Sequence, residues 1–201
     1  GKQGFEIASE FTKRGGKVTL ITGPVNIPFP ACENIIQVNT AKEMLDSVYQ
    51  QLPADILICN AAVADWKLVP KISSNKNIDV NNKIKKNNSS LLFETIKNPD
   101  ILATIAKSNL RPKIVIGFSA ETNNLRKNAY SKLISKNVDL IVANDVSNNK
   151  VFGEDYNKVC LIEKNNCEEW ETQSKKSVAF NLVNKINDLL TNYNQRGINA
   201  K

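Results

Sequence analysis

The stretch Asp55-Ile-Leu-Ile-Cys-Asn-Ala-Ala-Val-Ala-Asp65 decides the fold of this chain, because a short apolar run in it ends abruptly in small residues and one carboxylate. Residues 55–59 carry apolar side chains on both faces, which predicts a buried strand of a parallel sheet. Residues 60–64 then present backbone with little side-chain bulk at the carboxyl end of that strand. Ligands of open α/β sheets bind at this edge, and Asp65 adds an acceptor-only charge to it. Tight strand-to-loop packing explains the same small residues, so the segment alone leaves both interpretations open.

Outward from this strand, helical and extended patterns alternate along the chain. The patterns predict helices over residues 4–14, 40–52, 101–107, 122–136 and from about 174 onward, and strands over residues 18–22, 35–39, 55–59, 113–118, 138–143 and 159–163. We expect a long polar loop between about residues 60 and 88, and a late hairpin that reaches Glu171. Strands separated by helices predict an α/β fold with a Rossmann-like doubly wound, mostly parallel sheet and a late β-hairpin. We expect one domain over residues 1–194 and a flexible tail over residues 195–201.

The amino-acid composition limits the classes of function that fit this chain. The 201 residues include 27 Lys and Arg against 20 Asp and Glu, so the net charge of +7 favours an anionic partner. The absence of histidine excludes Ser-His and Cys-His catalysis and histidine metal sites. The four cysteines form no C-x-x-C motif, and two of them, Cys59 and Cys160, lie in apolar runs as expected of reduced core residues. Without a signal peptide or an apolar run of membrane-spanning length, we expect a cytoplasmic protein with no membrane partner.

Several lysines lie where a phosphate group would need them. The run Lys83-Ile-Lys-Lys86 places three ammonium groups in a polar loop, typical of a lid over a triphosphate, although solvated loop charge is the stronger interpretation in isolation. Lys132 and Lys136 are four residues apart on one predicted helix, where like charges repel unless an anion lies between them. Pro99-Asp100-Ile101 opens another helix, and the free amides of helix N-termini hold anions. Each feature alone is a weak signal.

Two further strand ends repeat the pattern of the first. Gly117-Phe-Ser-Ala-Glu121 closes one strand and Ala143-Asn-Asp145 closes the next, both in small residues followed by polar ones. In isolation, the ring of Phe118 fits a core position better than a base-stacking position. Three such ends in succession predict one ligand cleft along the carboxyl edge of the sheet.

Two other function classes fit the sequence less well. A dinucleotide-binding module requires a G-x-G-x-x-G motif and an acid after the first strand, whereas Gly23-Pro24 follows the predicted strand 18–22. A nucleic-acid-binding domain is suggested only by the net charge of +7, because the lysines are scattered along the chain. We therefore expect no nucleic-acid partner.

An ordered set of motifs resembles one known family. The motifs are Gly1-Lys-Gln-Gly-Phe5, Ala61-Ala-Val-Ala-Asp65, Lys83-Ile-Lys-Lys86, Lys97-Asn-Pro-Asp-Ile101, Gly117-Phe-Ser-Ala-Glu-Thr-Asn123 and Ala143-Asn-Asp-Val-Ser147. Over about residues 1–190 the chain resembles the phosphopantothenate–cysteine ligases, also called phosphopantothenoylcysteine synthetases. In bacteria this domain is usually the C-terminal half of a bifunctional coenzyme A biosynthesis protein, whose other half is a decarboxylase that uses FMN.

The resemblance implies a reaction and its partners. The bacterial enzymes use CTP and Mg²⁺ to activate the carboxylate of 4′-phosphopantothenate as an acyl-cytidylate, which cysteine then converts to an amide. The family is dimeric, so a homodimer is expected. The resemblance gives no set of metal ligands in this sequence.

The resemblance also implies roles for particular residues. Lys83 would be catalytic and would hold the triphosphate together with Lys132 and Lys136. The other residues that would line the nucleotide site are Asp65, Pro99, Asp100, Ile101, Leu102 and Phe118. Those that would contact or support the phosphopantothenate end are Ala61, Ala62, Asn144 and Asp145.

Two departures from the family pattern affect these expectations. The family motif Arg-x-x-x-Asn-x-Ser-Ser-Gly ends where this chain starts, at Gly1, so we expect a piece of a longer protein that binds CTP but is impaired in turnover. The loop over residues 66–82 is longer than in compact members of the family. Lys83 is therefore assigned by its motif rather than by its distance from Asp65, and Lys71 and Lys76 are alternatives for its role.

Overall fold

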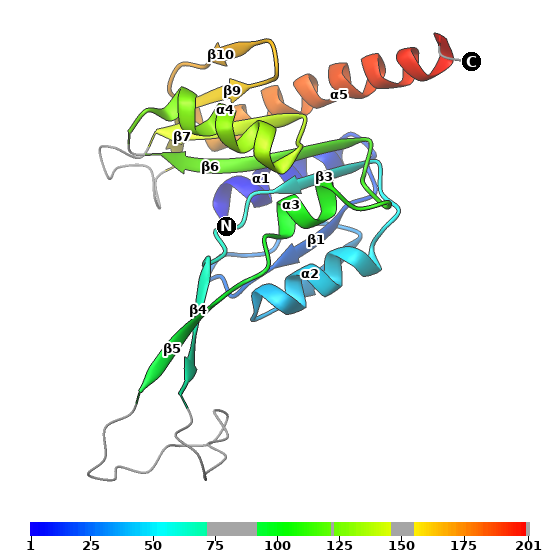
Figure 1. Cartoon of the computed structure of the whole chain (residues 1–201). Helices are drawn as coiled ribbons and strands as arrows, with labels where there is room; N and C mark the ends of the chain where they lie inside the picture. Colours follow the sequence, from blue (N-terminus) through cyan, green and yellow to red (C-terminus); the bar gives the residue numbers. More distant parts are fainter. Residues whose placement is uncertain (72–91, 122, 146–154, 200–201) are drawn as a thin grey trace.

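A computed structural model describes residues 1–71, 92–121, 123–145 and 155–199 of the chain (Figure 1). Its helices are α1 (Lys2–Lys13), α2 (Ala41–Gln50), α3 (Ile101–Ala106), α4 (Leu125–Lys136) and α5 (Lys175–Asn199). Its first strands are β1 (Thr19–Thr22), β2 (Asn34–Gln37), β3 (Ile56–Cys59), β4 (Trp66–Pro70), β5 (Phe93–Lys97) and β6 (Ile114–Glu121). The later strands are β7 (Leu140–Asp145), β8 (Tyr156–Asn157), β9 (Val159–Ile162), β10 (Cys167–Glu169) and β11 (Gln173–Ser174).

The central sheet has five strands in the order β10-β9-β7-β6-β3. β3, β6 and β7 run parallel to one another, whereas β9 pairs antiparallel with β7 and forms an antiparallel hairpin with β10 at one side of the sheet. The predicted α/β fold with a mostly parallel sheet and a late hairpin is therefore confirmed. β1 and β2 form a separate parallel pair, and β4 and β5 form a separate antiparallel pair.

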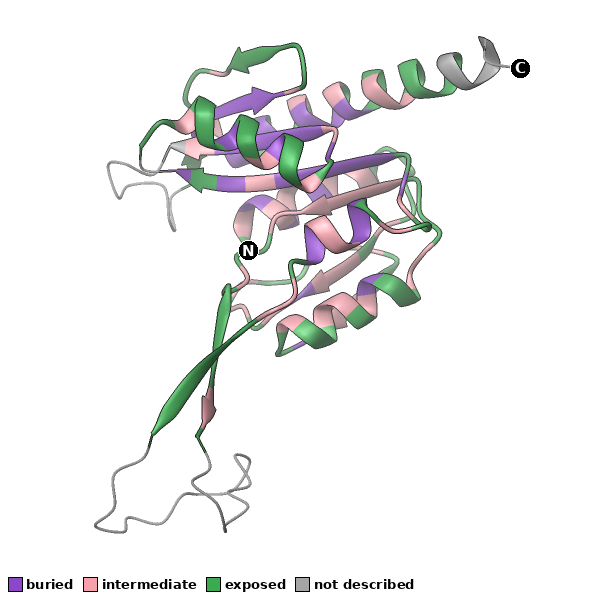
Figure 2. Ribbon diagram, in the orientation of Figure 1, coloured by how far each residue is buried: buried purple, intermediate pink, exposed green. Residues whose placement is uncertain are grey.

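Helices cover both faces of the sheet because its strands alternate two sets of apolar side chains. Ile114, Ile116, Leu140 and Val142 pack with α1 and α5 on one face. The intervening residues of β6 and β7 pack with α3 and α4 on the other face. Figure 2 shows the buried residues concentrated in the sheet and on the helix sides that meet it.

Local signals fix where several helices begin. Thr40 Oγ1 accepts a hydrogen bond from Glu43 N at 3.1 Å, and Glu43 Oε2 accepts one from Thr40 N at 3.3 Å, so the two residues form a capping box at the start of α2. Asp100 caps α3 by accepting from Ala103 N at 3.0 Å. Ser174 accepts from Ser177 N at 3.0 Å at the start of α5.

The helix expected from residue 122 begins only at Leu125. β6 continues three residues beyond its predicted end at Phe118, to Glu121, which pairs in register with Asp145 of β7. Asn124 then takes a left-handed conformation, with φ of 49°, between the strand and the helix. α4 also ends on a left-handed residue, Asn137, where asparagine is better tolerated than most residues.

Residues 66–70 correct a second expectation, because they form β4 rather than part of a loop. β4 pairs with β5 in the register Trp66↔Lys97 to Pro70↔Phe93, and the two strands project from the body of the molecule as an arm (Figure 1). Most side chains of the arm are exposed on both of its faces, so no alternating pattern marked it in the sequence. The rest of the expected loop, residues 72–91, lies outside the described residues.

The first and last helices extend further than the sequence predicts. α1 begins at Lys2 rather than at residue 4. α5 continues through residues 195–199, where a tail was expected. The described residues contain no helix that is long and apolar enough to cross a membrane.

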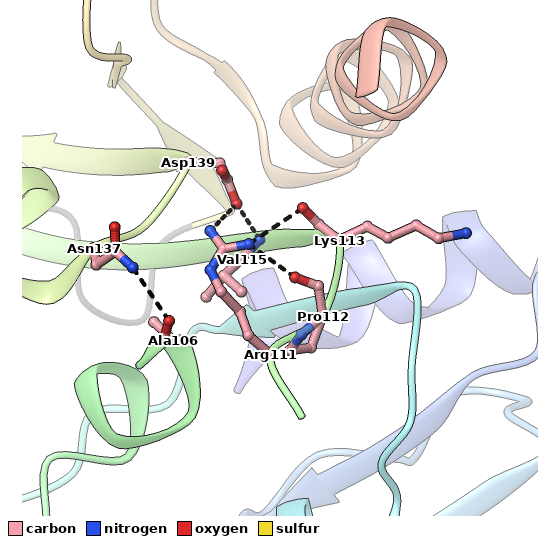
Figure 3. A network of polar contacts seen from close by, with 7 residues as sticks. All are labelled: Ala106, Arg111, Pro112, Lys113, Val115, Asn137 and Asp139. Carbon is pink, nitrogen blue, oxygen red and sulfur yellow. Dashed lines mark hydrogen bonds and ion pairs between the residues drawn. The ribbon is translucent and has the colours of Figure 1, made fainter. Parts of the chain in front are cut away.

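The amino ends of β6 and β7 are fixed by one carboxylate (Figure 3). Asp139 accepts hydrogen bonds from Val115 N at 2.7 Å and from Arg111 Nη2 at 2.7 Å. Arg111 Nη1 in turn donates to the carbonyl oxygen of Pro112 at 2.9 Å. This network sets the register of the two strands and therefore the positions of the residues at their opposite ends.

Candidate functional site

The three parallel strands of the central sheet end at one edge. The register Cys59↔Gly117 leaves residues 118–121 of β6 projecting beyond β3, where they pair only with β7. The carboxyl ends of β3, β6 and β7 therefore lie side by side, as expected of the ligand-binding edge of an open α/β sheet.

On the face covered by α3 and α4, both predicted phosphate-binding lysines are already paired with carboxylates. Lys136 Nζ lies 3.0 Å from Asp100 Oδ2, and Lys132 Nζ lies 2.7 Å from Glu121 Oε1. The repulsion expected between two lysines four residues apart is thus offset by the protein's own acids. The structure joins the end of β6, the start of α3 and one side of α4 into a single charged cluster.

Glu121 is the central member of this cluster that the sequence analysis did not assign to the site. It is only 8% exposed, and its second oxygen, Oε2, accepts from Asn128 Nδ2 at 3.2 Å. A buried carboxylate needs such partners because burial removes the water that would otherwise stabilise its charge. The signal in the sequence that could have assigned Glu121 to the site is that it is an acid directly at a strand end.

Cys59 ends β3 beside the same cluster. Burial raises the pKa of its thiol to about 12, the Asp100 carboxylate adds to the rise, and the Lys136 ammonium opposes it. The thiol is therefore neutral at physiological pH, as expected of a reduced core residue.

Asn98 joins the end of β3 to the start of α3. Its backbone N–H donates to the carbonyl oxygen of Asp65 at 2.8 Å, and its side-chain Nδ2 donates to that of Ala64 at 2.8 Å. These bonds hold the exposed carboxylate of Asp65 near the capped N-terminus of α3. The sequence analysis used Asn98 only as part of a motif, because its bonding partners lie more than thirty residues earlier in the chain.

Close backbone approach at this edge depends on small residues. Ala61 and Ala62 are exposed directly after β3. A Cβ atom on Gly4 of α1 would lie 3.0 Å from Asn60 Oδ1, so α1 also passes close to the end of β3. The small residues thus leave backbone accessible where a ligand would approach it.

Three of the predicted nucleotide-site residues do not present free side chains to the cluster. Ile101 and Leu102 are each 8% exposed and belong to the core, and a Cβ atom on Gly117 would lie within 2.4 Å of Leu102 Cδ2. Only their backbone remains for binding. Phe118 packs with the core on the opposite face of the sheet, the face covered by α1 and α5.

Asn144, predicted to support the substrate, also lies on the face of α1 and α5. Its Oδ1 accepts from Asn157 Nδ2 at 3.0 Å, and Oδ1 of buried Asn157 has no hydrogen-bond partner among the described residues. The side chain of Asp145 and all of Lys83, with its alternative Lys76, lie outside what the structure describes. Lys71 belongs to the described residues and lies directly after β4, at the end of the arm.

Two surface cavities in the described residues contain none of the predicted site residues. One, of about 420 Å³, lies between the start of α1, the start of α5 and the proline-rich loop at Pro28 and Pro30. The other, of about 410 Å³, lies between the start of α4 and the β9–β10 hairpin.

The fold and this edge define an open α/β protein with a charged cluster at the carboxyl ends of three parallel strands. The family described as DNA/pantothenate metabolism flavoprotein C-terminal domain matches residues 1–190, and the chain belongs to this family. The resemblance predicted from the ordered motifs is thereby confirmed.

Relatives and a solved structure agree with this assignment. The chain is 41% identical over 187 residues to the coenzyme A biosynthesis bifunctional protein CoaBC of Haemophilus influenzae, covering 92% of this chain and 45% of that protein. It is 42% identical over 188 residues to CoaBC of Borreliella burgdorferi, covering 91% of this chain and 45% of that protein. The crystal structure of the C-terminal domain of CoaBC matches with a TM-score of 0.75 and 31% identity, over 96% of this chain and 84% of that one. The chain thus spans less than half the length of these two curated relatives.

Proposed function

We propose that this domain is a phosphopantothenate–cysteine ligase of coenzyme A biosynthesis, a CTP-dependent acid–amino-acid ligase. The observation that carries the proposal is the family match over residues 1–190, which includes all of the ordered motifs. The cluster of Lys132, Lys136 and the N-terminus of α3 at that edge supports an anionic substrate.

The proposed reaction has two steps. In the first, a carboxylate oxygen of 4′-phosphopantothenate attacks the α-phosphorus of CTP, forming an acyl-cytidylate and breaking the bond to pyrophosphate. In the second, the amine of cysteine attacks the acyl carbon, the amide forms, and CMP leaves. The first step brings a carboxylate towards a triphosphate, so it needs positive charge around the phosphates and no histidine.

Lys132 and Lys136 suit the triphosphate because each ammonium carries three N–H donors. In each case the carboxylate partner occupies one donor direction. Lys132 can therefore keep its bond to Glu121 while it donates to a phosphate oxygen. Lys83 is proposed as the third and catalytic lysine, on its motif alone.

The other proposed contacts use the backbone and one exposed acid. Asp65 is assigned to the nucleotide, beside backbone groups of residues 99–102. Phe118 is assigned to the nucleotide on the family pattern alone, because its ring packs with the core on the other face of the sheet. The backbone at Ala61 and Ala62 is assigned to the phosphopantothenate end, with Asn144 and Asp145 in support. Cysteine would bind at the same edge and accept the acyl group in the second step.

A Mg²⁺ ion fits these residues as an ion that arrives with the nucleotide. Within the described parts of the chain, no three Asp, Glu, Cys or His residues gather into a cage. Mg²⁺ commonly binds through one or two carboxylates together with substrate phosphates, and Asp65 or Asp100 offers such a carboxylate. When bound, Mg²⁺ would neutralise charge on the triphosphate. FMN is assigned to a separate decarboxylase half and has no proposed role in this domain.

We propose that the domain acts as a homodimer. The supporting observation is the β4–β5 arm, on which Trp66, Leu68, Phe93 and Ile96 are exposed although they are large and apolar. Apolar surface of this kind is typical of protein interfaces.

Thermal unfolding with Mg²⁺ and CTP, ATP or NADPH, measured in parallel, tests the proposal. A ligand that binds only the native state adds about 2.7 kcal/mol at 100 times its dissociation constant, which is a readily measured rise in Tm. We expect CTP to raise Tm more than ATP, and NADPH to have no effect. Stabilisation by NADPH alone would instead identify a nicotinamide-binding module and contradict the ligase assignment.

A further inference from the structure

The β9–β10 hairpin brings two cysteines together away from the charged cluster. Cys160 Sγ lies 3.2 Å from Cys167 Sγ, and both residues are free thiols. Cys160 is buried at 4% exposure, whereas Cys167 is exposed on β10, at the edge of the sheet. We propose that this pair is an oxidation site, at which a hydroperoxide converts the two thiols into an intramolecular disulfide.

The strand register allows the bond to form. Cys167 pairs with Ile162 and Glu169 pairs with Cys160, so the two cysteines are diagonal neighbours on one face of the hairpin. A disulfide requires the sulfurs to approach by roughly 1 Å from their present contact. β10 is exposed along its whole length and has no neighbour on its outer side among the described strands, so it has room to make this movement.

The surroundings give the two sulfurs different roles. Cys167 is exposed, so a hydroperoxide in solvent reaches its sulfur directly, and Cys167 is assigned as the attacking sulfur. Burial raises the pKa of Cys160 to about 12, so Cys160 stays a thiol and is assigned as the resolving partner.

An oxidant of small size can reach this position. Cys167 is exposed to solvent, and the cavity of about 410 Å³ at the start of α4 reaches Cys160 from the other side, with Arg126, Lys158 and Glu169 among its lining residues. Its volume far exceeds that of a water molecule, about 30 Å³, and therefore that of hydrogen peroxide.

The chemistry balances in two steps. The Cys167 thiolate attacks one oxygen of the hydroperoxide, the O–O bond breaks, and a sulfenic acid and an alkoxide or hydroxide form. The Cys160 sulfur then attacks the sulfenic sulfur, the S–O bond breaks, and the hydroxyl group leaves as water with the Cys160 proton. The dithiol loses two electrons and the peroxide gains them. This inference does not depend on the proposed ligase function.

Peroxide treatment followed by alkylation and peptide mass mapping without reductant tests the proposal. In the 201-residue chain we expect a cross-link between Cys160 and Cys167 as the first product, reversed by a dithiol reductant. Cys167→Ser should abolish it, and because Cys167 is exposed this variant should fold normally. Cys32→Ser is the control and should leave the cross-link unchanged.

Two outcomes would overturn the proposal. One is oxidation of Cys167 to a sulfinic acid while Cys160 stays free, and the other is a disulfide between two chains.

Discussion

At the residue scale, the charged cluster combines a buried carboxylate and a half-exposed one. Glu121 has 10% of its side chain exposed, whereas Asp100 has 49% exposed. The two lysines that pair with these acids therefore contribute differently to folding, although both are proposed to hold the same triphosphate.

This difference predicts separate outcomes for Lys132→Gln and Lys136→Gln. Lys132→Gln should destabilise the fold by about 1–3 kcal/mol, because it leaves a buried carboxylate without its charged partner. Lys136→Gln should cost less than about 1 kcal/mol, since Asp100 stays hydrated. Urea unfolding measures both values.

Measuring CTP binding separates the effect of each variant on stability from its effect on the proposed phosphate contact. Each variant should weaken CTP binding about tenfold or more, the loss expected for a charge-assisted hydrogen bond of about 1.5–3 kcal/mol. The double variant Lys132→Gln/Glu121→Gln should regain stability but not affinity. Recovery of affinity in the double variant would show that Lys132 acts only on the fold.

At the element scale, the short helix α2 depends on the charge of its capping box. Hydrogen bonds from the backbone of Asn39, and then from Thr40, lower the pKa of Glu43 below its ordinary value of 4.5. A lowered pKa in the folded state means that ionised Glu43 stabilises the fold above pH 4.5, and that this contribution is lost as pH falls through the folded-state pKa.

Glu43→Gln should therefore lower Tm near neutral pH, and the difference from the unaltered chain should close as pH falls below the lowered pKa of Glu43. Thermal unfolding over this pH range measures the effect. Asp46→Asn, which removes a carboxylate from the same helix, is the control. A difference that persists unchanged at acid pH would contradict a role for the Glu43 charge.

The β4–β5 arm carries the prediction for assembly. Leu68 is 70% exposed, and an isolated two-stranded ribbon has little stability of its own in water. If the arm forms the proposed dimer interface, Leu68→Lys should convert the dimer to a monomer in light scattering at micromolar concentration. Leu110→Lys is a matched control, because Leu110 is 50% exposed but lies outside the arm, between α3 and β6. A dimer that survives Leu68→Lys would place the interface elsewhere.

The arm also shows where sequence patterns stop being informative. The strands and helices of the sheet were predictable because burial imposes a period of about two or 3.6 residues on their apolar positions. Trp66 to Pro70 is exposed on both faces, and its partner strand starts more than twenty residues later, so neither a period nor a tight turn marked it.

The candidate site was predictable in part for the same reason. The strand ends at Asp65, Phe118 and Asn144 follow from the apolar runs that precede them. The pairing of Lys132 with Glu121 does not, because it depends on how far β6 extends beyond β3 and on where α4 begins.

At the scale of the whole molecule, α5 is a long helix of which only the first part is needed for the core. Leu182, Val183 and Ile186 are almost fully buried, whereas residues 191–195 are exposed. Burial of each of the three side chains contributes about 1.5–3 kcal/mol, or about 5–9 kcal/mol together. That sum is comparable with the total stability of a typical domain, about 5–15 kcal/mol.

Two truncations test this difference. A chain that ends after Asn181 should show no cooperative unfolding transition by circular dichroism. A chain that ends after Tyr193 should unfold cooperatively with Tm nearly unchanged, because it keeps every buried residue of α5. A cooperative transition in the shorter chain would show that the core on that face closes without α5.

The pairing of α1 with α5 has a consequence for the order in which the protein can be completed. Gln3 of α1 donates from Nε2 to the carbonyl oxygen of Lys175, 172 residues further along the chain, and both helices pack on the same face of the sheet. A ribosome makes α1 early and α5 late, and a contact across so long a separation cannot form until both have emerged. During synthesis, the apolar face of β6 and β7 that contacts both helices therefore stays exposed until α5 leaves the exit tunnel. Chaperones can bind this face in the meantime.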